Sequence, residues 1–455
     1  MNNLNAFQKL KKIHQEFIFK YWDLLNEKNQ LELLHQVEAL DLTLFIEQQL
    51  AVKKSKKQKE GEGELIPIDT PTLRGNAEDI AYGKELIARG EVGCIIVAGG
   101  QGTRLRFKGP KGAYPVSIIN KKSLFQIFSE KTIAAGKEAH RSLPLAIMTS
   151  PQNSQDTLDF FKEKNGFGLE KDQIDFFSQG QLPLLTPEGN LFLEAKYRIA
   201  EGPDGNGSTL KNFHESGLLS KWKSRGVKYF NFVLIDNPLA DPFDANLIGH
   251  HARKKDAVTV KSVLRENPEE KVGVLVKKKG RIYVEEYTEL PEKEKTYRLE
   301  SGALKHQAAS ISLFCFSLKV LEEALDFYSK MPWHLAIKAA DYLDESGHSI
   351  KPTTPMAVKF EKYIFDLLPL FDKVGVLLYP REEVFAPLKN YCGTDDLQSV
   401  QTALQNRDRE IFSSITGQPP PPSPFELAQD FYYPTKELLE KWSNQTAPIQ
   451  SYIEP

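Results

Sequence analysis

Cysteines are few, and long apolar runs are absent. The 455 residues include three cysteines, Cys94, Cys315 and Cys392, which are far apart and form no CxxC pair. This spacing argues against a disulfide framework or a zinc site, and we expect three buried free thiols in a reducing cytoplasm. No apolar run approaches the ~20 residues of a transmembrane helix, and the first residues lack the apolar segment of a secretory signal.

Charge of one sign is not in excess either. The chain has 59 lysines and arginines against 61 aspartates and glutamates, which gives a formal net charge of −2. Neither nucleic acid nor an anionic membrane surface attracts such a chain overall, so we expect neither as a partner. A local basic pocket is compatible with this balance. The length predicts two or three domains and a sizeable core.

Three regions differ in their residue pattern. Residues 1–75 have apolar residues at helical spacing and then a charged segment at 53–64, which predicts a helical region followed by an exposed linker. Residues 76–390 have the pattern of one large domain. Residues 391–455 include the proline-rich segment 417–424 and one short helical pattern, so we expect a small C-terminal region.

Apolar runs alternate with helical patterns from about residue 93 onward, after a helical pattern at 76–92. The predicted strands are 93–100, 143–150, 229–239 and 257–264, and the predicted helices are 76–92, 123–140 and 208–226. This alternation predicts an α/β fold with a mixed, mostly parallel open sheet flanked by helices, and with an antiparallel hairpin at 271–290. Ligands of such sheets bind at the carboxyl ends of the strands, so the residues that follow each strand are the candidates for function.

The segment 97–116, VAGGQGTRLRFKGPKGAYPV, follows the first of these strands. It fits neither common phosphate-loop pattern, because Gly109 precedes proline where a Walker loop has lysine, and because Leu105 occupies the third glycine position of the dinucleotide pattern. Its glycines at 99–102 still allow a ligand to approach the backbone closely, and its basic residues favour an anion such as a di- or triphosphate. A tight turn with solvated basic side chains explains the residues equally well.

Three further strand ends carry polar residues. Gln179 suits hydrogen bonding to a base edge, or the capping of a turn. The segment 201–208, EGPDGNGS, needs unusual backbone angles, whether as a ligand loop or as an exposed turn. Asp236 ends an apolar run, where a carboxylate is costly unless it is paired or binds a metal. Mg²⁺ takes one or two carboxylates together with phosphate oxygens, so we favour a metal here over a helix or turn cap.

These segments occur together, in this order, in one known family. The chain resembles the eukaryotic-type UTP:sugar-1-phosphate uridylyltransferases, and among them most of all the UDP-N-acetylhexosamine pyrophosphorylases. The resemblance covers about residues 75–400 and rests on AGGQGTRLRFKGPKG, KSLFQIFSEK, FFSQGQLPLL, PDGNGS, LIDNPLADP, VGVLVKKKGRIYVEEYTEL, FEKYIFDLLP and REEVFAPLKN. It implies a Rossmann-like nucleotide-diphospho-sugar transferase fold and the conversion of UTP and a sugar 1-phosphate into a UDP-sugar and pyrophosphate.

The resemblance also implies roles for individual residues. The catalytic cations that face the phosphates are then Arg104, Lys111 and Lys389, and the Mg²⁺ ligand is Asp236. The implied nucleotide-binding residues are Gly99, Gly100, Gln179, Pro203, Gly205 and Asn206. The implied sugar-binding residues are Glu286, Ser310 and Phe365.

Three departures from the family pattern concern the first loop, the sugar pocket and the C-terminus. Arg106 stands where the family usually has glycine, and Ser310, in HQAASIS, stands where the hexosamine enzymes have an asparagine that faces the sugar. The C-terminal β-domain of the family is not recognisable after residue 424. Its oligomer contacts therefore do not carry over, and we expect a monomer or a homodimer.

The resemblance predicts a cytoplasmic, Mg²⁺-dependent uridylyltransferase that uses UTP and N-acetylglucosamine 1-phosphate. The alternative within the enzyme class is a UTP–glucose-1-phosphate uridylyltransferase or a UDP-sugar pyrophosphorylase of broad specificity, because Ser310 lacks the amide of asparagine. A non-catalytic nucleotide-sugar sensor is a third alternative, and the presence of Lys111, Asp236 and Lys389 argues against it.

Overall fold

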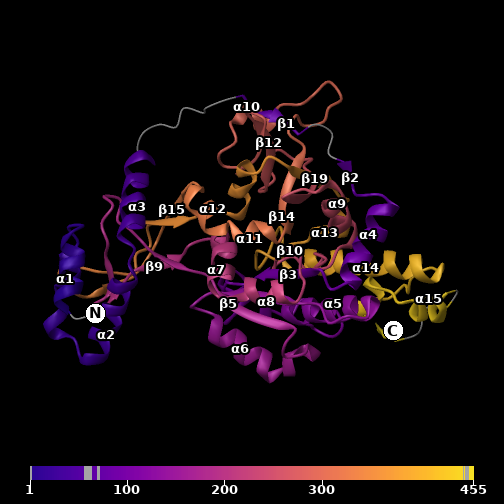
Figure 1. Ribbon diagram of the computed structural model, residues 1–455, viewed down its shortest axis with the longest axis horizontal. Coiled ribbons are helices and arrows are strands. Elements are labelled where there is room, and N and C mark those ends of the chain that lie inside the picture. Colours follow the sequence, from indigo (N-terminus) through magenta and orange to yellow (C-terminus); the bar gives the residue numbers. More distant parts are fainter. Residues whose placement is uncertain (1–2, 56–63, 69–71, 444, 446–449) are drawn as a thin grey trace. The chain divides into compact units, whose positions relative to one another are not determined.

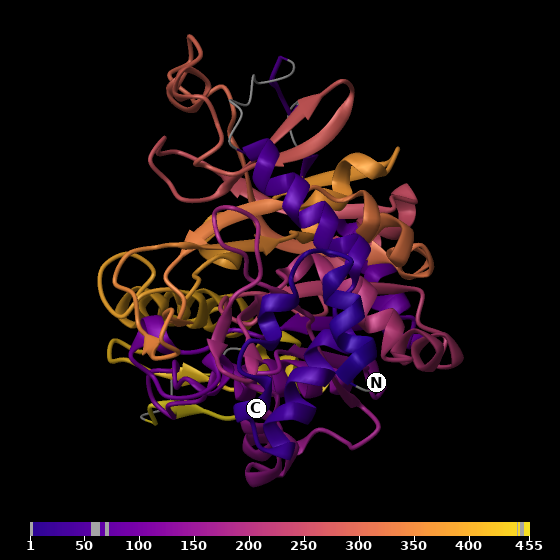
Figure 2. The ribbon, with the colours of Figure 1, turned by 90° about the vertical axis from the view of Figure 1, so that its left-hand side faces the viewer.

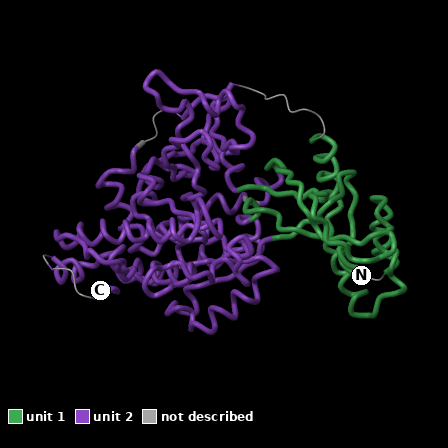
Figure 3. The backbone as a smooth tube through the Cα atoms, turned by 180° about the vertical axis from the view of Figure 1, so that it is seen from behind, with its two compact units in different colours: residues 1–62, 180–208, 330–363 green, residues 63–179, 209–329, 364–455 purple. Residues whose placement is uncertain are grey.

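The computed structural model describes residues 3–55, 64–68, 72–443, 445 and 450–455 (Figure 1). They belong to two compact units, which Figure 3 distinguishes by colour. The first unit contains residues 1–62, 180–208 and 330–363, and the second contains residues 63–179, 209–329 and 364–455. Most of the charged segment 53–64, predicted to be a linker, lies outside the described residues.

The first unit packs the N-terminal helices against short pairs of strands. Its helices are α1 (Asn3–Lys11), α2 (Glu27–Ala39) and α3 (Leu42–Ser55), with the 3₁₀ turns η1 (Glu16–Phe19), η2 (Trp22–Leu24) and η6 (Asn206–Ser208). Its strand pairs are β6 (Gln181–Pro183) with β9 (Glu201–Pro203), β7 (Leu193–Ala195) with β8 (Arg198–Ile199), β15 (His334–Lys338) with β18 (Ala357–Glu361), and β16 (Tyr342–Leu343) with β17 (Ser349–Ile350). The helical spacing in α2 is confirmed, because Leu33, Leu34 and Val37 are buried in this core.

A mixed sheet forms the centre of the second unit, and the described residues contribute eleven strands to it (Figure 1). Its main path is β2 (Thr72–Leu73), β19 (Val374–Leu378), β11 (Val258–Leu264), β14 (Ala308–Ser317), β10 (Tyr229–Leu234), β3 (Val92–Val97), β4 (Leu145–Thr149) and β5 (Ile174–Ser178). Only β14 is antiparallel to its neighbours on this path. The hairpin of β12 (Gly273–Lys278) and β13 (Arg281–Glu285) joins at β14, and β1 (Ile66–Pro67) pairs with β12. The predicted mostly parallel sheet and hairpin are confirmed.

Helices flank this sheet. They are α4 (Ala77–Ala88), α5 (Leu124–Ala139), α6 (Ser154–Glu163), α7 (Thr209–Glu215), α8 (Leu218–Ser224), α9 (Ala245–Lys254), α10 (Glu292–Thr296), α11 (Lys319–Glu322), α12 (Ala324–Lys330), α13 (Arg381–Val384), α14 (Leu397–Thr416) and α15 (Lys436–Trp442). The Ser123 side chain accepts a hydrogen bond from the Gln126 N–H, which starts α5 as its sequence predicts. The single helix predicted at 208–226 is wrong, because Gly217 adopts φ = 82° and separates α7 from α8.

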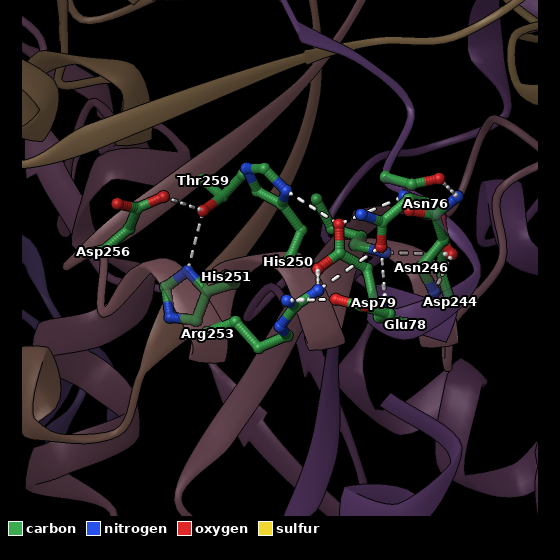
Figure 4. Close-up of polar contacts among 12 residues, drawn as sticks. Asn76, Glu78, Asp79, Asp244, Asn246, His250, His251, Arg253, Asp256 and Thr259 are labelled. Carbon is green, nitrogen blue, oxygen red and sulfur yellow. Dashed lines mark hydrogen bonds and ion pairs between the residues drawn. The ribbon is translucent and has the colours of Figure 1, made fainter. Parts of the chain in front are cut away.

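Helices α4 and α9 approach each other unusually closely. A Cβ atom at Gly83 of α4 would overlap the Ala245 carbonyl, and one at Gly249 of α9 would overlap the Asp79 carbonyl. Figure 4 shows the polar contacts around this crossing, in which Asp79 binds both His250 (3.2 Å) and Arg253 (2.7 Å). Because α9 follows the segment after β10, this packing fixes one side of that strand end.

The C-terminal residues pack as a small cluster of their own. The strands β20 (Glu426–Leu427) and β21 (Tyr452–Ile453) pair in parallel beside α14 and α15, around a core that includes Phe412 and Phe425. This cluster (yellow) and the β12–β13 hairpin lie at different ends of the second unit in both views (Figures 1 and 2). The Glu426 carboxylate accepts hydrogen bonds from the N–H groups of Ile119 and Asn120, both at 3.1 Å.

Two expectations from the composition have different outcomes. Cys94 and Cys315 are buried free thiols, but Cys392 is exposed, so the prediction of three buried thiols is wrong for this residue. Cys392 lies in a surface loop after the last sheet strand, where its sequence gives no apolar pattern. Among the described helices, none combines the length and the apolar character that crossing a membrane requires.

Candidate functional site

The loop after β3 folds back on itself instead of opening a helix. The Lys111 N–H donates to the Gly100 carbonyl (3.0 Å), and the Gly102 N–H donates to the Gly109 carbonyl (2.9 Å). The buried Asn153 side chain donates to the carbonyls of Ala98 (2.9 Å) and Gly100 (3.2 Å), which holds the start of the loop. A short 3₁₀ turn, η3 (Thr103–Leu105), replaces the α-helix that follows glycines in both common phosphate loops. This difference explains why neither pattern fits the sequence.

The predicted nucleotide residues Gly99 and Gln179 lie against each other. A Cβ atom at Gly99 would overlap the Oε1 atom of Gln179, whereas no atom lies within 4 Å of a Cβ atom at Gly100. Gln179 follows β5, and its backbone N–H donates to the Thr149 carbonyl (2.8 Å) at the end of β4. Glycine at 99 therefore makes room for the amide of Gln179, and Gly100 leaves its backbone open to a neighbouring molecule.

Lys111 and Asp236 form the centre of the site. The Lys111 Nζ atom lies 3.4 Å from the Asp236 Oδ2 atom, and the two side chains are 16% and 18% exposed. Asp236 stands just beyond β10, which is paired in parallel with β3, so the sheet places the carboxylate beside the loop that bears the lysine. The two strand ends thus lie together in the structure.

The segment that carries Lys389 is fixed to the same strand end. The Leu388 N–H donates to the Asp236 carbonyl (2.7 Å), and the Lys389 N–H donates to the Asp395 carbonyl (2.8 Å). Burial raises the pKa of the Asp395 carboxyl, while the charge of Lys389 opposes this rise and the charge of Asp236 adds to it. Two lysines and two carboxylates thus interact at one edge of the sheet, which gives the site both a cationic and an anionic part.

The two arginines of the loop have different surroundings. Arg104 is exposed on η3, and within the described residues its side chain has no hydrogen bond or ion pair. Arg106 has a left-handed backbone (φ = 54°), and its guanidinium carbon lies 4.3 Å from the centre of the Tyr391 ring. The left-handed angle accounts for the glycine that the family usually has at this position. Arg106 therefore contacts the Lys389 segment.

The predicted sugar residues gather around the β12–β13 hairpin. Glu286 directly follows β13, and Ser310 on β14 is the neighbour of Gly273 on β12. Phe365 lies in η7 (Ile364–Leu370), which packs against β13. The Ser310 Oγ atom is buried and has no hydrogen-bonding partner among the described residues.

Three predicted nucleotide residues belong to the first unit. Pro203 ends β9, opposite Gln181, and Asn206 begins η6. Gly205 has φ = 86°, and a Cβ atom there would overlap the Lys362 carbonyl, so the predicted need for unusual backbone angles is confirmed. The Gly207 N–H donates to the same carbonyl (2.8 Å) and holds the loop against the backbone of Lys362.

Three residues that shape the site were not predicted from the sequence. Asn153 holds the loop carbonyls, Asn237 contacts the Lys389 segment, and Asp395 adds a carboxylate. The sequence does contain a signal for Asn237, because this second polar residue directly follows Asp236 at the end of an apolar run. The other two stand in ordinary polar loops, where a single sequence gives no signal.

A divalent metal fits this arrangement through one carboxylate. The described residues contain no group of three or more histidine, cysteine or acidic residues that could hold a metal alone. Mg²⁺ needs only one or two carboxylates when phosphate oxygens supply the rest of its shell. Asp236 offers such a carboxylate, since Lys111 contacts its Oδ2 atom from 3.4 Å and the side chain is partly exposed.

Known proteins resemble this chain along most of its length. The probable UDP-N-acetylglucosamine pyrophosphorylase of Schizosaccharomyces pombe is 35% identical over 395 residues, 81% of this chain and 82% of that protein. The UDP-N-acetylglucosamine pyrophosphorylase of Saccharomyces cerevisiae is 34% identical over 403 residues, 84% of each chain.

Solved structures are similar as well. The crystal structure of a putative UDP-N-acetylglucosamine pyrophosphorylase from Entamoeba histolytica has a TM-score of 0.76 at 29% identity, and covers 86% of this chain and 99% of that one. The uridine diphosphate N-acetylglucosamine pyrophosphorylase from Trypanosoma brucei has a TM-score of 0.82 at 22% identity, and covers 100% and 98% of the two chains. The second likeness concerns the fold alone, which agrees with the predicted fold class.

The sequence profile of one family covers the chain from within α3 to just before α15. It matches residues 44–433, a span that includes every predicted site residue. The resemblance drawn from the motifs is thereby confirmed: the chain belongs to the UTP–glucose-1-phosphate uridylyltransferase family.

Proposed function

We propose that this uridylyltransferase joins UTP and N-acetylglucosamine 1-phosphate to UDP-N-acetylglucosamine, with release of pyrophosphate. The observation that carries the proposal is the Lys111–Asp236 pair, which lies at the edge of the sheet beside the Gly99–Gln179 contact. The names of the yeast relatives support N-acetylglucosamine as the sugar.

The reaction needs little covalent help from the protein. A sugar 1-phosphate is mostly dianionic at neutral pH, with a second pKa near ~6, so its oxygen attacks without a general base. A bond forms between this oxygen and the α-phosphorus of UTP, and the bond from the α-phosphorus to the β-phosphate oxygen breaks in line. The electron pair leaves with pyrophosphate. Catalysis then consists of positioning and of charge neutralisation.

The cationic side chains and the Gln179 amide have separate roles in the reaction. Lys111 neutralises the departing pyrophosphate with help from the exposed Arg104, and Lys389 offsets the charge that develops at the α-phosphate. Gln179, which lies against Gly99, binds the uracil edge. Glu286 and Phe365 orient the sugar.

Asp236 holds Mg²⁺ in this proposal. The ion would supply Lewis-acid neutralisation of the phosphate oxygens. Lys111 shares the carboxylate, so its ammonium group is kept beside the phosphates. The buried unpaired thiols of Cys94 and Cys315 support a cytoplasmic location.

A second candidate is the same reaction with glucose 1-phosphate or with several sugars. Ser310 favours it, because a hydroxyl stands where an amide would face the N-acetyl group. The name of the matching family points the same way.

Pyrophosphate release from UTP with three sugar 1-phosphates tests both candidates. We expect the highest kcat/KM with N-acetylglucosamine 1-phosphate, compared with N-acetylgalactosamine 1-phosphate and glucose 1-phosphate. A preference for glucose 1-phosphate favours the second candidate. Tight UTP binding without pyrophosphate release from any of the three contradicts both.

Substitution of Lys111 tests the catalytic assignment. Lys111→Ala should lower kcat by about 10²-fold, the usual effect of removing one group that stabilises transition-state charge. Lys108→Ala is the matched control, because Lys108 is an exposed lysine of the same loop. Equal activity of the two variants would remove Lys111 from the mechanism.

A further inference from the structure

The side chain of Asn237 joins the strand end of Asp236 to the segment of Lys389. Its Nδ2 atom donates to the Val384 carbonyl (2.7 Å), and its Oδ1 atom accepts from the Ala386 N–H (3.0 Å). Asn237 is 2% exposed, so these bonds are shielded from water. One amide thus satisfies a donor and an acceptor of a segment about 150 residues further along the chain.

The backbone beside Asn237 adds a third bond between the same two segments. The Asp236 carbonyl accepts from the Leu388 N–H (2.7 Å), directly before Lys389. On the other side, the Lys389 N–H is held by the Asp395 carbonyl (2.8 Å). The N–H groups of Leu388 and of Lys389 itself are therefore both hydrogen-bonded, and the Asp236–Asn237 dipeptide supplies the anchor on the side that precedes the lysine.

We propose that Asn237 is a positioning residue that sets Lys389 at the distance from Asp236 at which both act on the same phosphate. This inference rests on the proposed roles of Asp236 and Lys389. Only an amide fits the two backbone partners, because an aspartate oxygen would face the Val384 carbonyl with like charge, and an alanine would leave both buried backbone groups unpaired.

A second buried asparagine, on the strand that precedes Asn237, separates this role from general packing. Asn231 of β10 is 1% exposed, and its Nδ2 atom donates to the Pro242 carbonyl (3.0 Å). It thus binds one backbone carbonyl, but in a segment that carries none of the site residues. Asn231→Ala is therefore the matched control for a loss of stability without a change at the site.

The experiment compares six variants of the full chain: Asn237→Asp, Asn237→Ala, Asn231→Ala, Lys389→Ala, Asp236→Asn and the double variant Asn237→Asp with Lys389→Ala. For each, kcat and KM are measured with Mg²⁺, UTP affinity is measured by calorimetry without Mg²⁺, and stability is measured by urea unfolding. Asn237→Asp has almost the same volume as asparagine, so it keeps the test valid where Asn237→Ala fails to fold.

We expect both Asn237 variants to lower kcat at least tenfold and to weaken UTP binding as much as Lys389→Ala does. Asn231→Ala should lose stability and keep the kcat of the unchanged chain. The double variant Asn237→Asp with Lys389→Ala should be no slower than Lys389→Ala alone, because a positioning residue acts through its target.

Two results overturn the inference. One is an Asn237 variant that loses stability but keeps its kcat, as the Asn231 control does. The other is a double variant whose losses multiply. Asp236→Asn and Lys389→Ala with full turnover would instead refute the proposed site itself, which separates the two failures.

Discussion

Gly100 and Gly226 both have open space where a Cβ atom would stand, but their backbones differ. Gly226 has φ = 83°, and the φ of Gly100 lies outside the left-handed region. Gly100→Ala should therefore leave the free energy of unfolding unchanged within about 0.5 kcal/mol. Because the open backbone at 100 is the proposed approach of the nucleotide, the same change should lower kcat/KM for UTP at least tenfold, about 1.4 kcal/mol.

Gly226→Ala should show the opposite pair of effects. A left-handed alanine costs roughly 1–2 kcal/mol, so stability should fall, while kcat/KM stays the same because Gly226 lies in the turn before β10. Urea unfolding and initial rates on both variants make the comparison. An active Gly100→Ala enzyme would contradict close approach of UTP at this residue.

Arg106 combines a strained backbone with a contact of its side chain. Replacing it with glycine should relieve about 1–2 kcal/mol of left-handed strain and lose ~0.5–1 kcal/mol of cation–π attraction to Tyr391. Glycine also loses more backbone entropy on folding than arginine does, which destabilises the variant. We therefore expect Arg106→Gly to change stability by less than about 1 kcal/mol.

The contact itself is measured by a double-mutant cycle with Tyr391→Ala. A coupling of about 0.5–1 kcal/mol in urea unfolding is expected if the stacked pair forms in solution. Additive effects would show that Arg106 points into water.

Helices α4 and α9 cross at Gly83 and Gly249, and this close packing predicts how a larger residue at the crossing changes stability. In an isolated helix, Gly→Ala stabilises by about 0.5–1 kcal/mol. At Gly249 the added carbon would overlap the Asp79 carbonyl, so the helices must separate. Gly249→Ala should therefore lower the free energy of unfolding by about 1–3 kcal/mol, although alanine has the higher helix propensity.

Ala81→Ser is the control, because it adds one atom to the exposed face of α4. Its unfolding midpoint in urea should stay near that of the unchanged chain. A Gly249→Ala variant more stable than the unchanged chain would mean that the close crossing does not form. Because α9 follows the Asp236 segment, loss of the crossing should also lower activity.

At the scale of the whole molecule, the sequence predicts the secondary-structure elements better than it predicts contacts between residues far apart in the chain. Strands such as β3 and β10 are mostly apolar runs, so period and length reveal them, and parallel order then places Asp236 beside Lys111. The bond from Asn237 to Val384 joins residues 147 apart, and nothing in either local pattern encodes it. For the same reason the sequence did not predict that 180–208 and 330–363 pack with the N-terminal helices. Roles taken from the resemblance, such as Glu286 for the sugar, stay predictions.

Two buried groups should give the whole molecule opposing dependences on pH. Burial raises the pKa of Asp408 to about 7, although Tyr432 and the Leu427 N–H donate to its carboxylate. Burial lowers the pKa of His251, which contacts Thr259 and Ser317, to about 3. Each shift spans roughly three pKa units, which corresponds to ~4 kcal/mol.

The signs follow from which state binds the proton. Between about pH 4 and 7 the folded state holds a proton on Asp408 that the unfolded state releases, so Asp408 lowers stability as pH rises. Between about pH 3 and 6.5 the unfolded state binds a proton at His251 that the folded state excludes, so His251 raises stability as pH rises. The two effects offset each other over much of the acid range.

Asp408→Asn should remove the effect of Asp408 and leave that of His251. We expect urea unfolding of this variant to show stability that rises by several kcal/mol from pH 4 to 6.5, whereas the unchanged chain varies much less. Tyr432→Phe is the opposite test: it removes a donor that favours the Asp408 carboxylate, so the fall in stability should extend to higher pH. Parallel pH profiles for Asp408→Asn and the unchanged chain would show that Asp408 is already ionised in the folded state over this pH range.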